Sequence, residues 1–567
     1  MAIKAPRFGW IWLLIGLLLA IGGAQHAARV QTADGTVDVR DVRFLGTGGK
    51  QMSALLYVPR TATAQTPAPG ILAVHGYINS RETQSAFAIE FARRGYVVLA
   101  MDQTGHGYSD GPAFSNGFGG PDGLAYLRSL PMVDKANIGL EGHSMGGWTV
   151  LAAAAAMPDD YKAIVLEGSS TGKPYAAEGS PRWPRNLGLI YSQYDEFSKL
   201  MWDVDRAKDV VDSAKLKAVF GTTDRIMPRK LYGSLADGTA RGLATPPVTH
   251  PGDHISTEAV ARAIDWFGVT LAGGRPIPSS NQIWWGKEIG TALGLIGYVM
   301  IVLGAFDLLL HLPAFAGVRG SAESAVPSRD GGWRRSFLLT AIVPALLFFP
   351  VFSLTFLAVP PNPVLPQTVA TQIALWVLLG ALITRWTARG AVSGRQSGWG
   401  QSIAIGLLSV GAGYAALAYV DQRYHTDFRF WVLAVKLPSL MQLLIAAIYV
   451  VPITYGFLAT VRVLTDRLTV GSDGVIAQYG WAKAALVLGF VVMLVADYAA
   501  FFATGQLPTA LDPLSTVIAL QFPPVLAAVA VIAIFTWRRT GSYRPGAVLA
   551  GVMVTLMVTA GTATQGW

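Results

Sequence analysis

Residues 138–157 read IGLEGHSMGGWTVLAAAAAM and contain the G-x-S-x-G motif Gly142-His143-Ser144-Met145-Gly146. An apolar strand precedes the motif and ends at Glu141, and an alanine-rich helix is predicted from Met145 to about Met157. The flanking glycines permit the tight strand-to-helix turn that exposes a serine oxygen. The first turn of the helix adds positive potential where an oxyanion would form. The stretch therefore predicts that Ser144 is a nucleophile rather than a residue of a purely structural turn.

Strands and helices alternate on both sides of this motif. Helical periodicity from Glu82 to Arg94 ends at Gly95, where a cap is expected, and Ser256 can cap a helix that ends near Leu271. The expected strands are Val37–Phe44, Met52–Val58, Gly70–Val74, Tyr96–Met101, Ile138–Glu141, Ala163–Glu167 and Leu216–Phe220. Continuous apolar strands that alternate with helices predict an α/β fold, with a mostly parallel sheet covered on both faces.

Three motifs in this region resemble those of the α/β-hydrolase superfamily, in particular its monoacylglycerol-lipase and serine-aminopeptidase-like branch. They are His75-Gly76-Tyr77 after the third strand, residues 102–109 (DQTGHGYS), and the motif around Ser144. The resemblance covers roughly residues 37–272 and implies a serine hydrolase.

The resemblance also implies roles for individual residues around the nucleophile. The backbone N–H groups of Tyr77 and Met145 would form the oxyanion hole. His75 and His106 would be turn and hydrogen-bonding residues, and His143 would pack beside the motif.

The serine needs a base and an orienting acid, which in this fold follow it in the order acid, then histidine. His250 and His254 both follow, and we favour His254 because it directly precedes the last helix, where the resemblance locates the catalytic histidine. Asp224 is the expected acid, since residues 221–228 (GTTDRIMP) look like the G-x-x-D-x-x-x-P turn of the family after an apolar strand. Asp253, beside the histidine, is the alternative.

Residues 171–215 interrupt the expected sheet and carry six aromatic side chains. The family inserts a cap over the active site at this point. The segment is therefore predicted to be a small cap, either as an apolar lid over an acyl pocket or as aromatic packing of a helical excursion.

The rest of the chain is strongly apolar. The whole chain is 52% hydrophobic and only 14% charged, against about 25% charged in an ordinary soluble domain. Eight runs approach the ~20 residues needed to cross a bilayer: 289–311, 336–358, 368–385, 402–420, 440–461, 484–503, 515–537 and 546–563. We therefore expect an α/β-hydrolase domain at 29–275, with the cap at about 171–215, followed by an all-α transmembrane bundle at 286–567.

Residues 1–28 contain a further apolar segment, Phe8–Ala28, which follows Lys4 and Arg7. It is either an uncleaved signal anchor, which we favour, or a cleaved signal peptide. In both cases the hydrolase domain would leave the cytoplasm.

Every other loop of the bundle is basic, which predicts cytoplasmic loops and an extracytoplasmic hydrolase domain at the cell membrane. The basic residues are Arg319, Arg329, Arg334, Arg335, Arg385, Arg389, Arg395, Arg462, Arg467, Lys483, Arg538, Arg539 and Arg544. Only the loop at 421–438 opposes the pattern, with Arg423, Arg429 and Lys436.

The predicted function is hydrolysis of an ester, with a lipid or lipid-linked ester as one candidate because the chain is membrane-attached. A thioester and a small peptide stay open as substrates, because the same triad serves all of them. The alternatives are an acyltransferase that receives its acceptor through the bundle, and a sensor or transporter whose hydrolase domain only binds ligand. Asp307 and Asp497 lie within predicted spans and are either functional or satisfied by a neighbouring helix. The chain has no cysteine, which excludes thiolate metal sites; no metal or cofactor is expected, and no basic stripe suggests nucleic acid.

Overall fold

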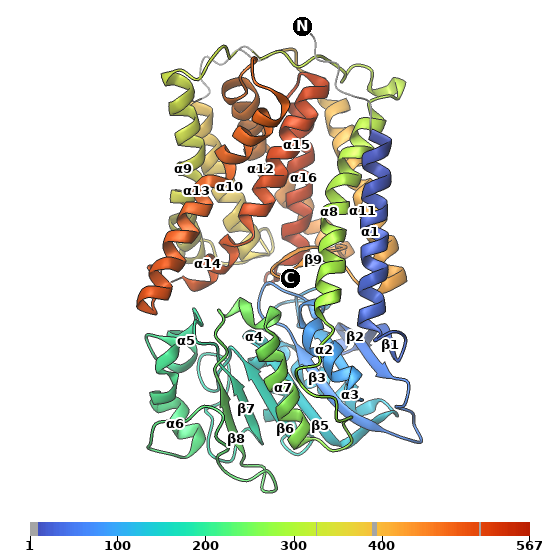
Figure 1. Ribbon diagram of the computed structural model, residues 1–567, viewed down its shortest axis with the longest axis vertical. Coiled ribbons are helices and arrows are strands. Elements are labelled where there is room, and N and C mark those ends of the chain that lie inside the picture. Colours follow the sequence, from blue (N-terminus) through green and yellow to red (C-terminus); the bar gives the residue numbers. More distant parts are fainter. Residues whose placement is uncertain (1–8, 325, 388–393, 510–511) are drawn as a thin grey trace.

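The computed structural model describes residues 9–324, 326–387, 394–509 and 512–567. They form two stacked regions, a helical bundle and an α/β domain, with the carboxyl terminus lying between them (Figure 1). The amino-terminal end of α1 (Gly9–Gln31) lies at the far end of the bundle, and α1 leads directly into the α/β domain.

The α/β domain is built on one eight-stranded sheet with the order β1-β2-β4-β3-β5-β6-β7-β8. The first two strands pair antiparallel, as do β2 and β4, and the remaining neighbours are parallel. The strands are β1 (Val37–Leu45), β2 (Gln51–Pro59), β3 (Ala68–Val74), β4 (Val97–Asp102), β5 (Val133–His143), β6 (Ala163–Glu167), β7 (Leu187–Ile190) and β8 (Arg241–Ala244). This confirms the predicted α/β-hydrolase fold.

Helices cover both faces of the sheet, which is why its central strands are apolar along their whole length. One face packs against α3 (Gly120–Ser129) and α4 (Met145–Ala156), and the other against α2 (Ser85–Arg93) and α7 (Thr257–Thr270). The remaining short helices are α5 (Ser198–Trp202) and α6 (Ala214–Phe220).

The predicted strand Leu216–Phe220 is wrong, because these residues belong to α6. The Ser213 side chain caps this helix by accepting the N–H of Leu216, and Gly221 ends it with a φ of 65°. The buried side chains Leu216, Val219 and Phe220 have helical spacing rather than the alternation of a strand.

The predicted cap at 171–215 also needs correction, because it contains β7, a strand of the main sheet. Both β7 and β8 are only four residues long, which is too short to produce a clear sequence pattern. The strands that follow Ser144 are therefore β6, β7 and β8, and the loops after β7 and β8 carry Asp195 and His250.

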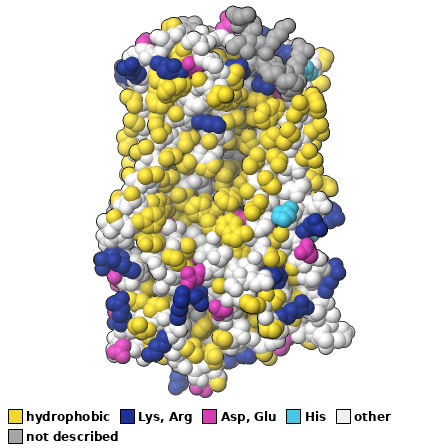
Figure 2. Space-filling model, in the orientation of Figure 1, with side chains coloured by type: hydrophobic (Ala, Val, Ile, Leu, Met, Phe, Trp, Pro, Cys, Tyr) yellow, Lys and Arg dark blue, Asp and Glu magenta, His cyan; other side chains and the backbone are white. Residues whose placement is uncertain are grey.

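The bundle follows from Trp285 onward. Among the described residues, eight helical segments are long and apolar enough to cross a membrane, namely α1 and seven in the bundle when α14 and α15 count as one, and α10 is a shorter apolar helix. The bundle helices are α8 (Trp285–Leu309), α9 (Gly331–Ala358), α10 (Thr368–Thr387), α11 (Trp399–Tyr424), α12 (Leu440–Val463), α13 (Val475–Thr504), α14 (Pro513–Ala519), α15 (Phe522–Thr540) and α16 (Arg544–Gly561); with α1 they reproduce the predicted multi-pass pattern. Figure 2 shows a broad hydrophobic surface over this region, with charged side chains at its two ends.

The first helix packs closely along α8 through glycines. A Cβ added at Gly23 would lie 2.4 Å from the carbonyl oxygen of Gly290, and one at Gly297 would lie 2.6 Å from that of Gly16. Small residues permit this backbone approach, which gives two membrane helices a large van der Waals contact. The α1 segment is therefore an integral element of the bundle.

Both predicted intramembrane acids have partners within the bundle. Asp307 forms an ion pair with Arg539 at 2.5 Å. Asp497 accepts hydrogen bonds from the hydroxyls of Thr509 and Thr516, each at 3.4 Å. These contacts favour the structural alternative for the two acids, since each carboxylate has a partner on a neighbouring segment.

Candidate active site

Ser144 lies at the turn between β5 and α4 with φ 54° and ψ −120°, a conformation that a non-glycine residue rarely adopts. A Cβ on Gly142 would lie 2.3 Å from the carbonyl oxygen of Gly146, and one on Gly146 would lie 2.1 Å from that of Val74. Both motif glycines are therefore required by close backbone contacts. The backbone N–H of Ser144 donates to the carbonyl oxygen of Glu167, at the end of β6, at 2.8 Å, which fixes the strained turn.

The loop after β3 lies directly against this turn. A Cβ added at Gly76 would be 3.2 Å from the Cβ of Ser144. Within the region of the chain that the structure describes, no hydrogen bond uses the backbone N–H of Tyr77 or of Met145. The two predicted oxyanion donors therefore have no hydrogen-bond acceptor among the described residues, and they belong to segments that flank the serine.

His75 and His106 have the bracing roles expected of them. Nδ1 of His75 lies 2.6 Å from the carbonyl oxygen of Gly76, and its Nε2 lies 3.3 Å from the backbone N–H of Gln103. Nδ1 of His106 lies 3.0 Å from the carbonyl oxygen of Thr104. Both rings hold loops in place, because each nitrogen in these contacts faces a backbone group.

A histidine–carboxylate pair lies beside the serine, but it is formed by His250 and Asp195. Nδ1 of His250 is 2.8 Å from Oδ2 of Asp195, and both side chains are buried. Asp195 follows β7 and His250 follows β8; the two strands are parallel neighbours, so their carboxyl ends meet. No hydrogen-bond partner for Nε2 of His250 occurs among the described residues, so this nitrogen is free to accept a proton.

The pair fits only because residue 168 is a glycine. Gly168 follows β6 with a φ of 53°, and a Cβ there would lie 2.8 Å from Nδ1 of His250 and 3.2 Å from Oδ2 of Asp195. The neighbouring residue Glu167 holds the backbone of Ser144. These contacts join the serine turn and the His250–Asp195 pair into one local unit.

The two triad partners expected from the sequence are not brought together. Asp224 is exposed in the loop after α6, where its own N–H donates to the Thr222 hydroxyl at 3.1 Å. Figure 1 shows α6 farther from the bundle than α5. His254 is buried against the ring of His143, with 4.0 Å between ring centroids, and neither of its nitrogens has a hydrogen-bond partner among the described residues.

The alternative acid, Asp253, is also directed elsewhere, because its Oδ1 accepts a hydrogen bond from Ser192. His143 packs beside the motif as expected, between His250 and His254, with its Nε2 3.0 Å from the carbonyl oxygen of His250.

The pKa values of the two candidate bases are shifted in opposite directions. Burial lowers the pKa of His250, but the charge and hydrogen bond of Asp195 outweigh it and hold the pKa above its ordinary value of 6.5. Burial, with the charges of His250 and Arg429 nearby, lowers the pKa of His254 to about 3. His250 can therefore take up a proton near neutral pH, whereas His254 is held neutral.

Segments of the bundle reach this site directly. The Tyr498 hydroxyl on α13 donates to Oε1 of Glu196 at 2.9 Å, while Oε2 of Glu196 accepts the backbone N–H of His250 at 2.7 Å. The Trp431 indole N–H donates to the carbonyl oxygen of Pro251 at 2.6 Å. The loop that carries His250 is thus held from the membrane side by two aromatic residues.

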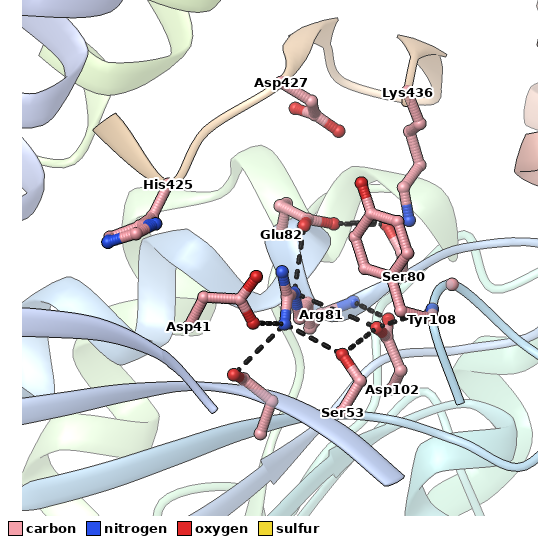
Figure 3. A network of polar contacts seen from close by, with 12 residues as sticks. Asp41, Ser53, Ser80, Arg81, Glu82, Asp102, Tyr108, His425, Asp427 and Lys436 are labelled. Atoms are coloured by element: carbon pink, nitrogen blue, oxygen red, sulfur yellow. Dashed lines mark hydrogen bonds and ion pairs between the residues drawn. The ribbon is translucent and has the colours of Figure 1, made fainter. Parts of the chain in front are cut away.

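A buried charge network joins the hydrolase domain to the hairpin β9 (Phe428–Phe430) and β10 (Leu433–Val435). Figure 3 shows Asp427 and Lys436, which flank this hairpin, above Glu82 and Arg81 of the hydrolase domain. Arg429 bonds to Asp427 at 2.6 Å and to the Thr83 hydroxyl at 2.7 Å, and Lys436 lies 3.5 Å from Glu82. Burial raises the pKa of Glu82, but Lys436, Arg81 and Arg429 hold it well below its usual range.

This network accounts for the basic loop at 421–438 that opposed the charge pattern, because Arg429 and Lys436 are buried beside carboxylates. The carboxyl-terminal tail adds a second junction: Thr564 exchanges backbone hydrogen bonds with Gly105 and Ala113 at 2.8 and 2.7 Å. The bundle thus packs against the end of the hydrolase domain that carries the loop of His250 and the loop after β4.

The sheet order, the strained serine turn and the histidine–carboxylate pair define an α/β-hydrolase domain. Consistently, residues 65–195 match the family described as serine aminopeptidase, S33. The matched range begins before the loop of Tyr77 and ends at Asp195.

Among curated proteins, the chain is 31% identical over 133 residues to a monoacylglycerol lipase of Mycolicibacterium smegmatis, which covers 22% of this chain and 45% of that protein. It is 36% identical over 107 residues to a mitochondrial palmitoyl-protein thioesterase of Homo sapiens, and this match covers 18% of this chain and 33% of that protein. The chain thus spans less than half the length of these relatives. A solved esterase of Pyrococcus furiosus is 16% identical with a TM-score of 0.32, over 43% of this chain and 94% of that one.

Proposed function

We propose that this protein is a membrane-anchored serine hydrolase that cleaves a carboxylic ester, with Ser144 as nucleophile, His250 as base and Asp195 as the orienting acid. The observation that carries the proposal is the 2.8 Å contact between His250 and Asp195 beside the strained serine turn. This assignment replaces Asp224 and His254, since Asp224 is exposed and His254 has no carboxylate partner among the described residues.

In the first step His250 accepts the Ser144 proton at Nε2 while the serine oxygen bonds to the ester carbonyl carbon. The oxyanion accepts hydrogen bonds from the N–H groups of Tyr77 and Met145. The carbon–oxygen bond to the alcohol then breaks, and His250 returns its proton to the leaving alkoxide. A water molecule, deprotonated by His250, attacks the acyl-enzyme, and the serine oxygen leaves with that proton, so that the products are one acid and one alcohol.

Asp195 acts through His250, because its carboxylate accepts the Nδ1 proton and keeps Nε2 free as the acceptor. The same carboxylate stabilises the imidazolium that forms in each step. Glu196 holds the backbone N–H of His250, which supports the position of the ring.

The proposal includes a multi-pass location with the hydrolase domain outside the cytoplasm. The support is the basic character of the loops at the end of the bundle away from the hydrolase domain. The loop at 421–438, which does not follow this charge pattern, has Arg429 and Lys436 buried. Arg389, one of the basic residues, lies outside the described residues. The glycine contacts between α1 and α8 support an uncleaved anchor.

A fluorophosphonate probe tests the nucleophile. Wild-type protein in detergent should be labelled, and Ser144→Ala should not be. Loss of the nucleophile should also lower p-nitrophenyl ester hydrolysis by about 10⁶-fold, to the background of the assay. Equal labelling of both proteins would refute the assignment of Ser144.

A further inference from the structure

A narrow cavity of about 50 Å³ lies where the loop after β3 meets the bundle, inside a hollow of about 670 Å³ that includes space open to solvent. The walls that come from α10, α14, α15 and α16 are mostly aliphatic and aromatic, while Arg429 of the hairpin, Gln521 and Thr562 add polar groups to the lining. Representative lining residues are Ile373, Phe522, Val525, Val554 and Val558. Such a lining favours a hydrocarbon chain over a polar ligand.

The wall on the hydrolase side consists of Ile78, Asn79 and Ser80, which directly follow Tyr77. One residue spans ~3.8 Å between Cα atoms, so the cavity begins about that far along the chain from an oxyanion donor. Ile78 has a φ of 57°, which is unusual for a β-branched residue, and its side chain packs against the core of the bundle. Strain of this kind is often kept where a ligand is held.

The same end of the cavity carries a buried amine. Lys436 is 4% exposed, and its Nζ has no hydrogen-bond acceptor among the described residues, with Glu82 at 3.5 Å as its ion-pair partner. Figure 3 shows the Lys436 side chain extending from the hairpin toward Ser80 and Tyr108. The cavity therefore has an apolar depth and a hydrogen-bond donor near the hydrolase domain, as an amphiphile with oxygen atoms at one end requires.

We infer that this cavity holds the acyl chain of the ester substrate, so that the membrane bundle supplies the acyl pocket of the hydrolase. The inference rests on the proposed function. The ester group, which is the oxygen-bearing end of the substrate, lies at Tyr77 and Ser144 on the Lys436 side of the cavity. Its hydrocarbon chain extends between α10, α15 and α16. The substrate class is then a long-chain acyl ester. The aromatic wall of Tyr77, Phe114 and Tyr175 remains for the leaving alcohol, since Phe114 and Tyr175 are 36% and 49% exposed.

The lining of α16 allows a graded test. Val554 and Val558 both line the cavity, and four residues of helix separate them by about 6 Å. The carboxyl end of α16 is nearest the hydrolase domain, since the tail that follows it bonds to Gly105. Val554→Phe therefore fills the deeper end of the cavity, and Val558→Phe fills the space that lies a helical turn closer to the ester.

The readout is kcat/KM for p-nitrophenyl esters from acetyl to palmitoyl, measured on the full chain in detergent. Wild type should gain about fourfold per methylene that enters the cavity, which corresponds to ~0.8 kcal/mol per buried CH₂. Val554→Phe should shift the preferred chain to a shorter length, Val558→Phe should shift it further, and Val554→Ala should lengthen it. Val492→Phe is the matched control, because Val492 is 59% exposed on α13 and should leave the profile as in wild type.

Fluorophosphonate labelling of Ser144 identifies any variant that fails to fold. If the phenylalanine variants fail to fold, the shift in chain-length preference of Val554→Ala tests the inference. An unchanged ratio of palmitoyl to acetyl hydrolysis in all three cavity variants would overturn the inference and leave the hydrolase proposal intact. A shift produced by Tyr175→Ala instead would assign the acyl chain to the aromatic wall. Wild-type protein that cleaves no ester of any length would refute the proposed function itself.

Discussion

Replacement of Asp195 by asparagine distinguishes the proposed triad from the one that the sequence favoured. The Asp195 carboxylate lies 2.8 Å from Nδ1 of His250 and accepts its proton. An asparagine amide at this position can donate to Nδ1, which favours the tautomer with the proton on Nε2. That tautomer cannot accept the serine proton, so the geometry survives and the chemistry fails.

The expected loss follows from the role of this carboxylate. An incorrect tautomer in a triad of this type costs about 10⁴ in kcat, which is ~5.4 kcal/mol of transition-state stabilisation. Asp224→Asn is the matched control, because Asp224 is exposed and is expected to leave kcat/KM on p-nitrophenyl acetate within about twofold, as for a surface substitution. A severe loss in Asp224→Asn with an active Asp195→Asn would refute the reasoning.

The pH dependence gives a second, independent measure. A general base must be neutral, so kcat/KM should rise with pH as the base loses its proton. The pKa of His250 is raised above 6.5, so the rise in wild type should be centred above that pH. If His254 were the base, its pKa of about 3 would mean that kcat/KM does not change between pH 5 and pH 8.

The substitution should also move this inflection. Asp195 is the main cause that raises the pKa of His250, and burial, which remains in the variant, lowers it. The residual activity of Asp195→Asn should therefore show an inflection at lower pH than wild type. Burial raises the pKa of Glu196 to about 7, so Glu196→Gln is needed as a control and should shift the inflection less. An inflection that Glu196→Gln removes would assign the profile to Glu196.

Three further outcomes are expected. Gly168→Ala should lower kcat by at least about 100-fold without loss of expression, since its Cβ would lie 2.8 Å from Nδ1 of His250; wild-type kinetics would contradict the packing described. Tyr498→Phe should lower kcat about fivefold with little change in KM, because one hydrogen bond worth ~1 kcal/mol is lost; an effect confined to KM would argue against a positioning role. Single cysteines at the exposed positions Ala177 and Gly331 should react differently with an impermeant maleimide on intact cells, with only position 177 labelled; the reverse pattern would invert the topology.

The fold of the hydrolase domain was predictable because its strongest signals are local. The turn around Ser144 needs its glycines within a few residues, and the apolar strands on both sides are continuous. The membrane spans are equally local, since each helix must satisfy its own backbone in lipid. The sequence by itself therefore determined the strand-to-helix turn at Ser144, the mostly parallel sheet and the series of long apolar helices.

Only the tertiary structure decided which histidine pairs with a carboxylate near the turn of Ser144. Asp195 and His250 are 55 positions apart and meet because they follow two neighbouring parallel strands of four residues each, too short to be recognised in sequence. The local pattern around Asp224 instead belongs to a helix end. The basic residues Arg429 and Lys436 look like loop charges in sequence, but long-range ion pairs bury them against the hydrolase domain. Pairing across such distances is fixed by the packing of strands and domains, and short sequence windows carry no record of it.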